Sequence, residues 1–103
     1  MRTIHITDAL SNSCLLASEL GNRLLELLQK ELKDCEAIEL DFAGYKYLSK
    51  EFLKESLGIL CSINGWETKT FEEKIHVINM DDDDREELEV VLNDVQMNMK
   101  LKD

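Results

Sequence analysis

Apolar and polar residues along this chain follow two periods, one typical of strands and one typical of helices. At residues 37–42, "AIELDF" alternates strictly, so three apolar side chains share one face of a strand while Glu39 and Asp41 lie on the other. Short runs rich in β-branched residues at 3–6 and 74–80 also predict strands. The pattern therefore predicts three strands, spread over most of the chain.

Three longer stretches repeat their apolar residues at three- and four-residue steps, which predicts helices over 15–33, 50–63 and 81–100. Their apolar stripes consist of Leu16, Leu20, Leu24, Leu27, Leu28 and Leu32; of Phe52, Leu53, Leu57, Leu60 and Ile63; and of Leu88, Val91, Leu92, Val95 and Met99. A single layer of helices is possible, since three helices cannot fully cover both faces of a sheet.

Polar residues and glycines mark the expected boundaries of these helices. Ser11 or Ser13 is the expected N-cap of the first helix. Gly21 interrupts that helix at a cost in helix propensity, which suits a close approach to a neighbouring element. Gly65 ends the second helix, and residues 67–73 are expected to form a polar connection.

The resulting order is β-α-β-α-β-α, which implies crossover connections and parallel pairing. The fold class predicted is α/β, a small sandwich with a mostly parallel sheet of three to five strands. Ile38 and Leu40 are expected to be buried in its central strand. At 103 residues, the whole chain (1–103) is expected to form one domain.

Composition narrows the possible functions. The chain has 22 acidic and 12 basic residues, for a net charge of −10, which argues against binding to nucleic acid or to an anionic membrane. Cys14, Cys35 and Cys61 are odd in number and widely spaced, with Cys14 and Cys61 in predicted helices. Free thiols and the lack of a signal-like apolar stretch predict a cytoplasmic protein.

No cofactor, metal or catalytic set is predicted. The acidic run at 81–84 lacks the spacing of a calcium loop and is interpreted as a solvated helix start. His5 and His76 fall in predicted strands, where a hydrogen-bonded pair of neighbours is expected. Asp41 and Glu55 are the candidates for an acid–base pair, but no nucleophile accompanies them, so an enzyme is not predicted.

The loop before the second helix carries the residues with the most chemical interest. Ser49 is interpreted as the N-cap of that helix, with a phosphate acceptor as the less favoured alternative. Lys50 is a cation in the first turn, where the helix dipole disfavours it; a pair with Asp41 or Glu51, a solvated side chain and a contact with an acidic partner all stay open. Tyr45, Tyr47 and Trp66 are either exposed contact residues or seals at the edge of the core.

The segment "LDFAGYKYLSKEFLKESLG", residues 40–58, resembles the STAS-like family of small bacterial domains known as the DUF4325 group, which is related to the STAS domains of anti-sigma factor antagonists. The positions that match the family pattern are Leu40, Asp41, Phe42, Gly44, Leu48, Ser49, Phe52, Glu55 and Gly58. The resemblance implies a STAS-like fold over most of the chain.

The resemblance also implies a regulatory switch, and here the chain departs from the pattern. STAS regulators are phosphorylated by an ATPase-type serine kinase on a serine of this loop, and the two family serines fall at Lys50 and Glu51. Ser49 is the one serine left in this loop, and it lies one position before the place of the phosphorylated serine. A phosphoserine at the usual place is therefore impossible, although phosphorylation of Ser49 is left open.

These observations predict a non-enzymatic regulatory or protein-interaction module that contacts a signalling partner through residues 44–55. The candidate contact residues are Asp41, Tyr45, Tyr47, Ser49, Lys50, Glu51 and Glu55. The resemblance implies a histidine-kinase-like ATPase or another signalling protein as the partner. The alternative is a small-ligand domain that binds an anion or a nucleotide at the same helix N-terminus.

Overall fold

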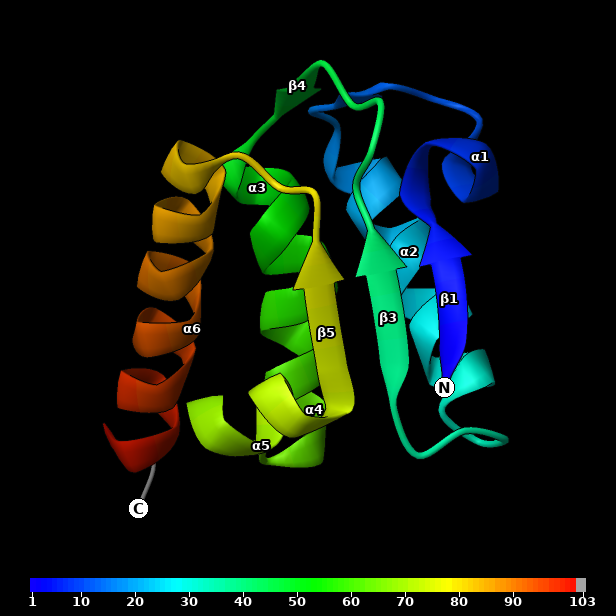
Figure 1. The fold of residues 1–103 in the computed structure, drawn as a ribbon. Helices are drawn as coiled ribbons and strands as arrows, with labels where there is room; N and C mark the ends of the chain where they lie inside the picture. The colour runs from blue at the N-terminus through cyan, green and yellow to red at the C-terminus, as the bar shows by residue number, and fades with distance from the viewer. Residues whose placement is uncertain (102–103) are drawn as a thin grey trace.

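Three parallel strands form the main sheet, and helices cover one of its faces (Figure 1). The computed structural model describes residues 1–101. Its strands β1 (Arg2–His5), β3 (Ile38–Asp41) and β5 (Ile75–Ile78) lie in the order β1-β3-β5. The α/β class and the parallel pairing predicted from the sequence are confirmed.

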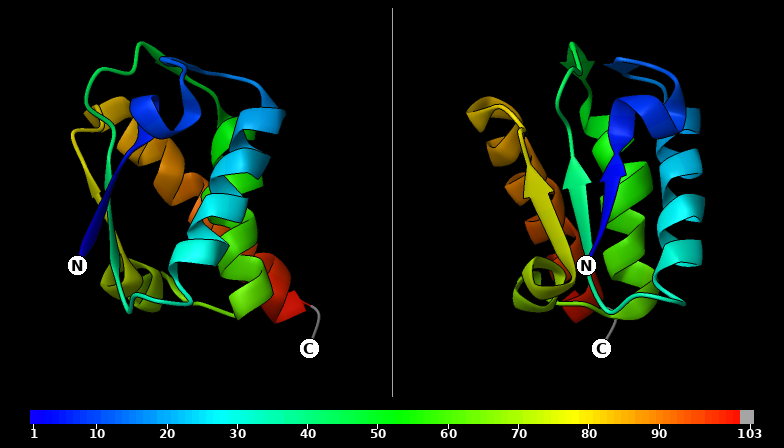
Figure 2. Two further views of the ribbon diagram at one scale, coloured as in Figure 1. Left: turned by 90° about the vertical axis from the view of Figure 1, so that its right-hand side faces the viewer. Right: turned by 45° about the vertical axis from the view of Figure 1, so that its right-hand side comes forward.

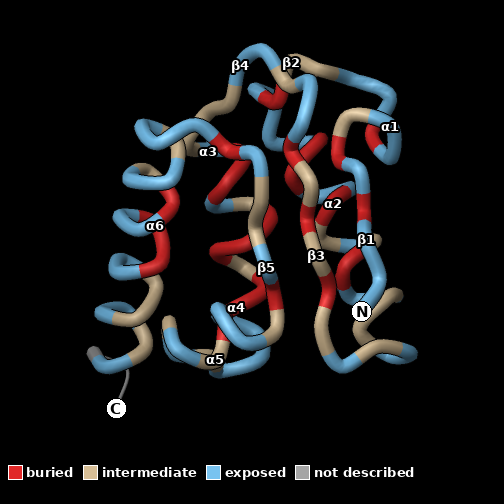
Figure 3. The backbone as a smooth tube through the Cα atoms, viewed as in Figure 1, coloured by how far each residue is buried: buried red, intermediate tan, exposed pale blue. Residues whose placement is uncertain are grey.

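The central strand is the one with the clearest alternation. Ile4 of β1, Leu40 of β3 and Val77 of β5 stand in one row of the sheet, because both neighbours pair with β3 in register. Ile38 and Leu40 are fully buried, as predicted, and Phe42 continues the same buried face beyond the strand. Figure 3 shows buried and partly buried residues alternating along β3.

The helix layer consists of α2 (Ser18–Glu31), a second long helix, and α6 (Asp82–Leu101). The second helix is continuous but changes its winding, from α3 (Lys50–Leu53) through a π-helical turn η1 (Lys54–Gly58) to α4 (Ile59–Asn64). Figure 2 shows that the three helices lie on the same side of the sheet and leave the other side open. The sheet is therefore covered on one face only.

Close packing joins the first two helices of this layer. A Cβ atom added to Gly21 would lie 2.8 Å from the Phe52 carbonyl oxygen and 2.9 Å from the Glu55 Cβ, so only glycine fits. The buried hydroxyl of Ser56 donates to the same Phe52 carbonyl at 2.7 Å. In the π turn the Ile59 N–H reaches back five residues to the Lys54 carbonyl. The close approach predicted from Gly21 is confirmed.

A second, two-stranded parallel sheet lies beyond the carboxyl ends of the main strands (Figure 1). It pairs β2 (Cys14–Leu15) with β4 (Tyr47–Leu48). Its presence corrects the sequence prediction for this region, because Cys14 lies in a strand and not in a helix. The first long helix begins only at Ser18, with Ala17 at its N-cap and no side-chain cap, so neither Ser11 nor Ser13 caps it.

Two short helices were also missed by the sequence pattern. A five-residue helix, α1 (Ile6–Leu10), follows β1, and α5 (Thr68–Lys74) replaces the polar connection predicted for residues 67–73. The predicted helix end at Gly65 is confirmed, since this residue has a left-handed φ of 66°. Within residues 1–101, no helix is both long and apolar enough to cross a membrane.

Candidate functional site

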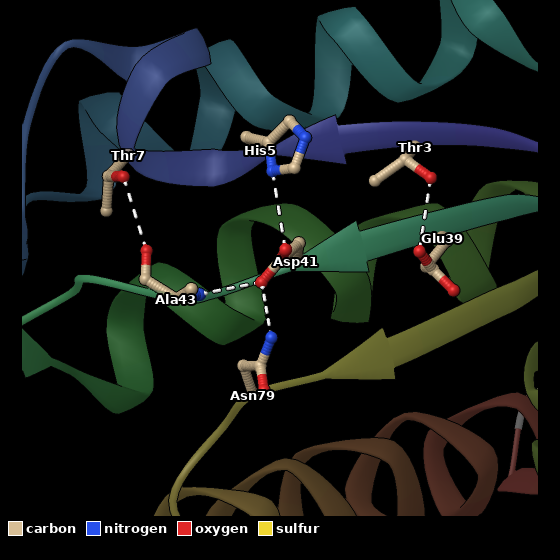
Figure 4. A network of polar contacts seen from close by, with 7 residues as sticks. All are labelled: Thr3, His5, Thr7, Glu39, Asp41, Ala43 and Asn79. Atoms are coloured by element: carbon tan, nitrogen blue, oxygen red, sulfur yellow. Dashed lines mark hydrogen bonds and ion pairs between the residues drawn. The ribbon is translucent and has the colours of Figure 1, made fainter.

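Asp41 joins the carboxyl ends of all three main strands through one carboxylate (Figure 4). Its Oδ1 accepts from the Ala43 backbone N–H at 2.9 Å and from the Asn79 side-chain amide at 2.8 Å. Its Oδ2 lies 3.3 Å from Nδ1 of His5, so β1, β3 and the segment after β5 meet at this residue. Asp41 therefore organises the end of the sheet.

The hydrogen bonds of this carboxylate favour its ionised form. The Asn79 amide, and then the Ala43 N–H, hold the pKa of Asp41 below its ordinary value, and His5 acts in the same direction. A lowered pKa suits a structural acceptor and is the opposite of what a general acid requires. Glu55, the other candidate for an acid–base pair, lies half-buried against Gly21, on the helix side of the sheet.

Tyr45 ties the loop after β3 to the start of α6. Its ring packs edge-on against Phe42, with centroids 5.9 Å apart. Its hydroxyl donates to the Asp84 carboxylate and accepts from the Asp81 N–H at 3.0 Å. Burial, together with the bond to Asp84, raises the pKa of Tyr45 to about 12. Tyr45 therefore seals the edge of the core, one of the two roles left open by the sequence.

Ser49 is the N-cap of α3, as predicted. Its Oγ accepts from the Phe52 N–H at 3.1 Å and donates to the Leu16 carbonyl at 2.7 Å. The Ser49 backbone N–H also donates to the Leu15 carbonyl at 3.0 Å. The serine thus closes the helix start and holds the segment after β2 against it.

Two large exposed side chains lie in or directly after the strands of the small sheet. Tyr47 is 62% exposed and Leu16 is 50% exposed. Cys14 pairs with Tyr47 in the small sheet, and Leu16 directly follows the strand that contains Cys14. Lys46 and Lys50 flank Tyr47 in the sequence. We call Leu16, Lys46, Tyr47 and Lys50 the loop surface.

The predicted contact residues differ in their exposure and in the contacts that they make. Glu51 is exposed in the first turn of α3, and Lys50 is half-buried. The ion pairs found among residues 1–100 are Arg2–Glu31 and His5–Asp41, so Lys50 does not pair with Asp41 or Glu51 there. Of the predicted contact residues, Asp41, Tyr45, Ser49 and Glu55 are held in structural contacts, whereas Tyr47, Lys50 and Glu51 are not.

The histidines and the acidic run differ in part from their predicted arrangement. His5 and His76 are not neighbours, because β3 lies between their strands, and His76 contacts the Glu73 carbonyl at 3.2 Å. The residues at 81–83 are exposed, but Asp84 is engaged by Tyr45. In the part of the chain that the structure describes, no three histidine, cysteine or acidic side chains gather as a metal site would require.

Three residues of this region escaped the sequence analysis. Leu16 was assigned to a helix stripe, and Asp84 to a solvated helix start. Asn79 stands where β5 ends, with a left-handed φ of 59°, a conformation that asparagine tolerates better than most residues. An asparagine directly after an apolar strand was therefore the one signal available for the Asp41 contact.

The fold and the arrangement of the loop define the class of protein. A parallel sheet, a loop with β4 and a capped helix follow one another as in a small STAS-like α/β domain. The family described as "STAS-like domain of unknown function (DUF4325)" matches residues 21–85, well over half of the chain, and the chain belongs to that family. No curated protein and no solved structure matches it.

Proposed function

We propose that this STAS-like domain is a cytoplasmic, non-enzymatic regulatory module that binds a signalling protein through residues 44–55 together with Leu16. The observation that carries the proposal is the exposure of two large side chains, Tyr47 in β4 and Leu16 directly after β2. Large apolar and aromatic side chains of this kind are frequent anchors in protein interfaces.

Two basic residues lie close to Tyr47 in the sequence. Lys46 directly precedes Tyr47 and Lys50 follows it by three residues, in a chain whose net charge is −10. A cationic rim around an apolar centre on an acidic protein favours a partner with an acidic patch, since unlike charges speed encounter and fix orientation. The proposed partner is a histidine-kinase-like ATPase or another signalling protein, as implied by the family.

The role of Ser49 supports binding without a phosphate switch. Its hydroxyl already donates to the Leu16 carbonyl and accepts from the Phe52 amide, and a phosphoryl group would replace the hydrogen that it donates to Leu16. The same occupied amide, with Glu51 exposed beside it, also disfavours an anion or nucleotide at this helix start. The loop surface is therefore proposed as a constitutive contact.

Site-specific photo-crosslinking in the native cell tests the proposal. A photoreactive phenylalanine analogue at position 47 is expected to capture one protein, identified by mass spectrometry as a kinase-like ATPase or another signalling protein. The substitution Lys50→Glu is expected to reduce this capture, because it reverses a rim charge. Denaturant unfolding should show that Lys50→Glu leaves the stability almost unchanged.

Matched controls lie at the far end of the molecule. The analogue at Ile63, which is 56% exposed on α4, should capture no common partner. Lys69→Glu on α5 introduces the same charge change as Lys50→Glu and should leave the capture at position 47 intact. Equal loss with both lysine variants, or equal capture from both positions, contradicts a specific loop surface.

A further inference from the structure

The outer edge of β5 is open. This strand pairs with β3 on one side, and no strand among residues 1–101 pairs with it on the other. The Ile78 carbonyl accepts from the Phe42 N–H, so it points toward β3. Because backbone groups alternate in direction along a strand, the N–H and carbonyl of Val77 point outward. The Val77 carbonyl accepts from the guanidinium of Arg85 at 2.6 Å, a donor in the place of a strand amide.

A groove of about 550 Å³ lies along this edge, between α5 and α6. Phe71, Ile75, Leu88 and Leu92 supply its apolar lining, and each of these is also part of the buried core. In Figure 1, α6 lies beyond β5, past the outer edge of the sheet. A further strand beside β5 would have an apolar helix face behind it.

The charge of the groove points to the kind of chain that fits. Glu72 on α5 and Glu89 on α6 lie on the two helices that border it, and Arg85 is the one basic residue in its described lining. The whole chain carries −10, so a second copy would be repelled. A chain that carries both apolar and basic residues would place apolar side chains in the groove and basic side chains near the two glutamates.

We propose that the open edge of β5 binds an extended basic segment of another protein as a fourth strand of the main sheet. Pairing of this kind takes its affinity from main-chain hydrogen bonds and its selectivity from alternate side chains. The site is distinct from the loop surface, with which it shares no residue. It stands whether or not the loop surface binds a partner.

A peptide of alternating lysine and valine, acetylated and amidated at its ends, is the probe. In an amide NMR titration of the full chain, saturable shifts are expected at Ile75 and Val77, with slower exchange of the Val77 amide. The same peptide with an N-methyl group on every residue keeps its charge but has no backbone N–H to donate on either edge, and should not bind. Equal binding of the two peptides would overturn the proposal.

Substitutions locate the contact. Val77→Pro removes an outward N–H that β3 does not use, so the substitution should abolish binding. The fold should survive, because proline is tolerated at such an edge position. Glu89→Lys should weaken binding by about two- to fivefold, as expected for the loss of an exposed ion pair. Glu86→Lys, the same charge change on α6 outside the groove, should have little effect. This second pair keeps the test decisive if Val77→Pro fails to fold.

Two other outcomes would also overturn the proposal. Shifts confined to residues 44–55 would show that the peptide binds at the loop and not at the edge of β5. A concentration-dependent dimer in sedimentation, lost in Val77→Pro, would show that a second copy occupies the edge.

Discussion

The two faces of the main sheet carry opposite kinds of side chain, although the same three strands supply both. Toward the helices, Ile38 and Leu40 are fully buried in the core. On the open face, Thr3 donates to Glu39 at 3.1 Å, and His5 contacts Asp41 at 3.3 Å. Both polar contacts bridge β1 and β3, at positions that face each other in the register.

This difference shows how a parallel sheet persists with one face in water. Parallel sheets are usually covered on both faces. Here the covered face supplies the apolar burial, and the open face adds contacts that hold neighbouring strands and their carboxyl ends together. Substitutions on the two faces should therefore differ both in size and in pH dependence.

The largest effect is expected on the covered face. Leu40→Ala removes a fully buried side chain from the central strand and should lower the free energy of unfolding by about 2–5 kcal/mol. Thr3→Val, on the exposed face one strand away, should change it by no more than about 0.5 kcal/mol. Urea melts of both variants measure the contrast. Similar losses would mean that the two faces are equally important.

A smaller loss is expected where the covering helices touch. Gly21→Ala should cost about 1–3 kcal/mol, because the added methyl group meets the backbone of α3 and the Glu55 side chain. Asn22→Ala, at the exposed neighbouring position, should be neutral or stabilising because alanine is the better helix former. Thermal unfolding compares the two, and a stabilising Gly21→Ala would argue against this close packing.

The next smaller effect is expected at the start of the second long helix and does not concern either face of the sheet. Ser49→Ala removes the cap of α3 and the bond to the Leu16 carbonyl, and should cost about 0.5–2 kcal/mol. Ser62→Ala, at an exposed position of α4, serves as the control with little expected change. Partner capture at position 47 should survive Ser49→Ala. Stoichiometric phosphate on Ser49 in the native protein would instead show a working switch.

The sequence predicted what depends on long periodic patterns. The alternation around Leu40 identified the central strand, and the stripes identified the three long helices. The short helix α5 escaped because Phe71 is its only buried residue, too little for a periodic signal. The π turn escaped since the stripe of Phe52, Leu57 and Leu60 continues through it.

The site was predicted only where its chemistry is local. The cap at Ser49 follows from a serine directly before a helix, so it could be predicted. Leu16 has helical spacing with Leu20, yet α2 begins after it, because residues 14–15 pair with β4 instead. The separation of His5 from His76 depends on strand order, which alternation within one strand does not encode.

The smallest effect at neutral pH is expected for Asp41→Asn, on the open face. The new side chain keeps an oxygen that can accept from Asn79 and Ala43, so mainly the negative charge is lost. Because the pKa of Asp41 is lowered from its ordinary value of 3.8, its ionised form stabilises the folded state. That contribution is present above the ordinary value and disappears as the pH falls through the lowered one. The difference in unfolding free energy between wild type and Asp41→Asn should therefore shrink on acidification. Glu51→Gln removes an exposed carboxylate, and its difference should stay nearly constant. Urea melts across the acidic range measure both, and a difference for Asp41→Asn that is flat or grows toward low pH would show that the carboxylate is not held in its charged form.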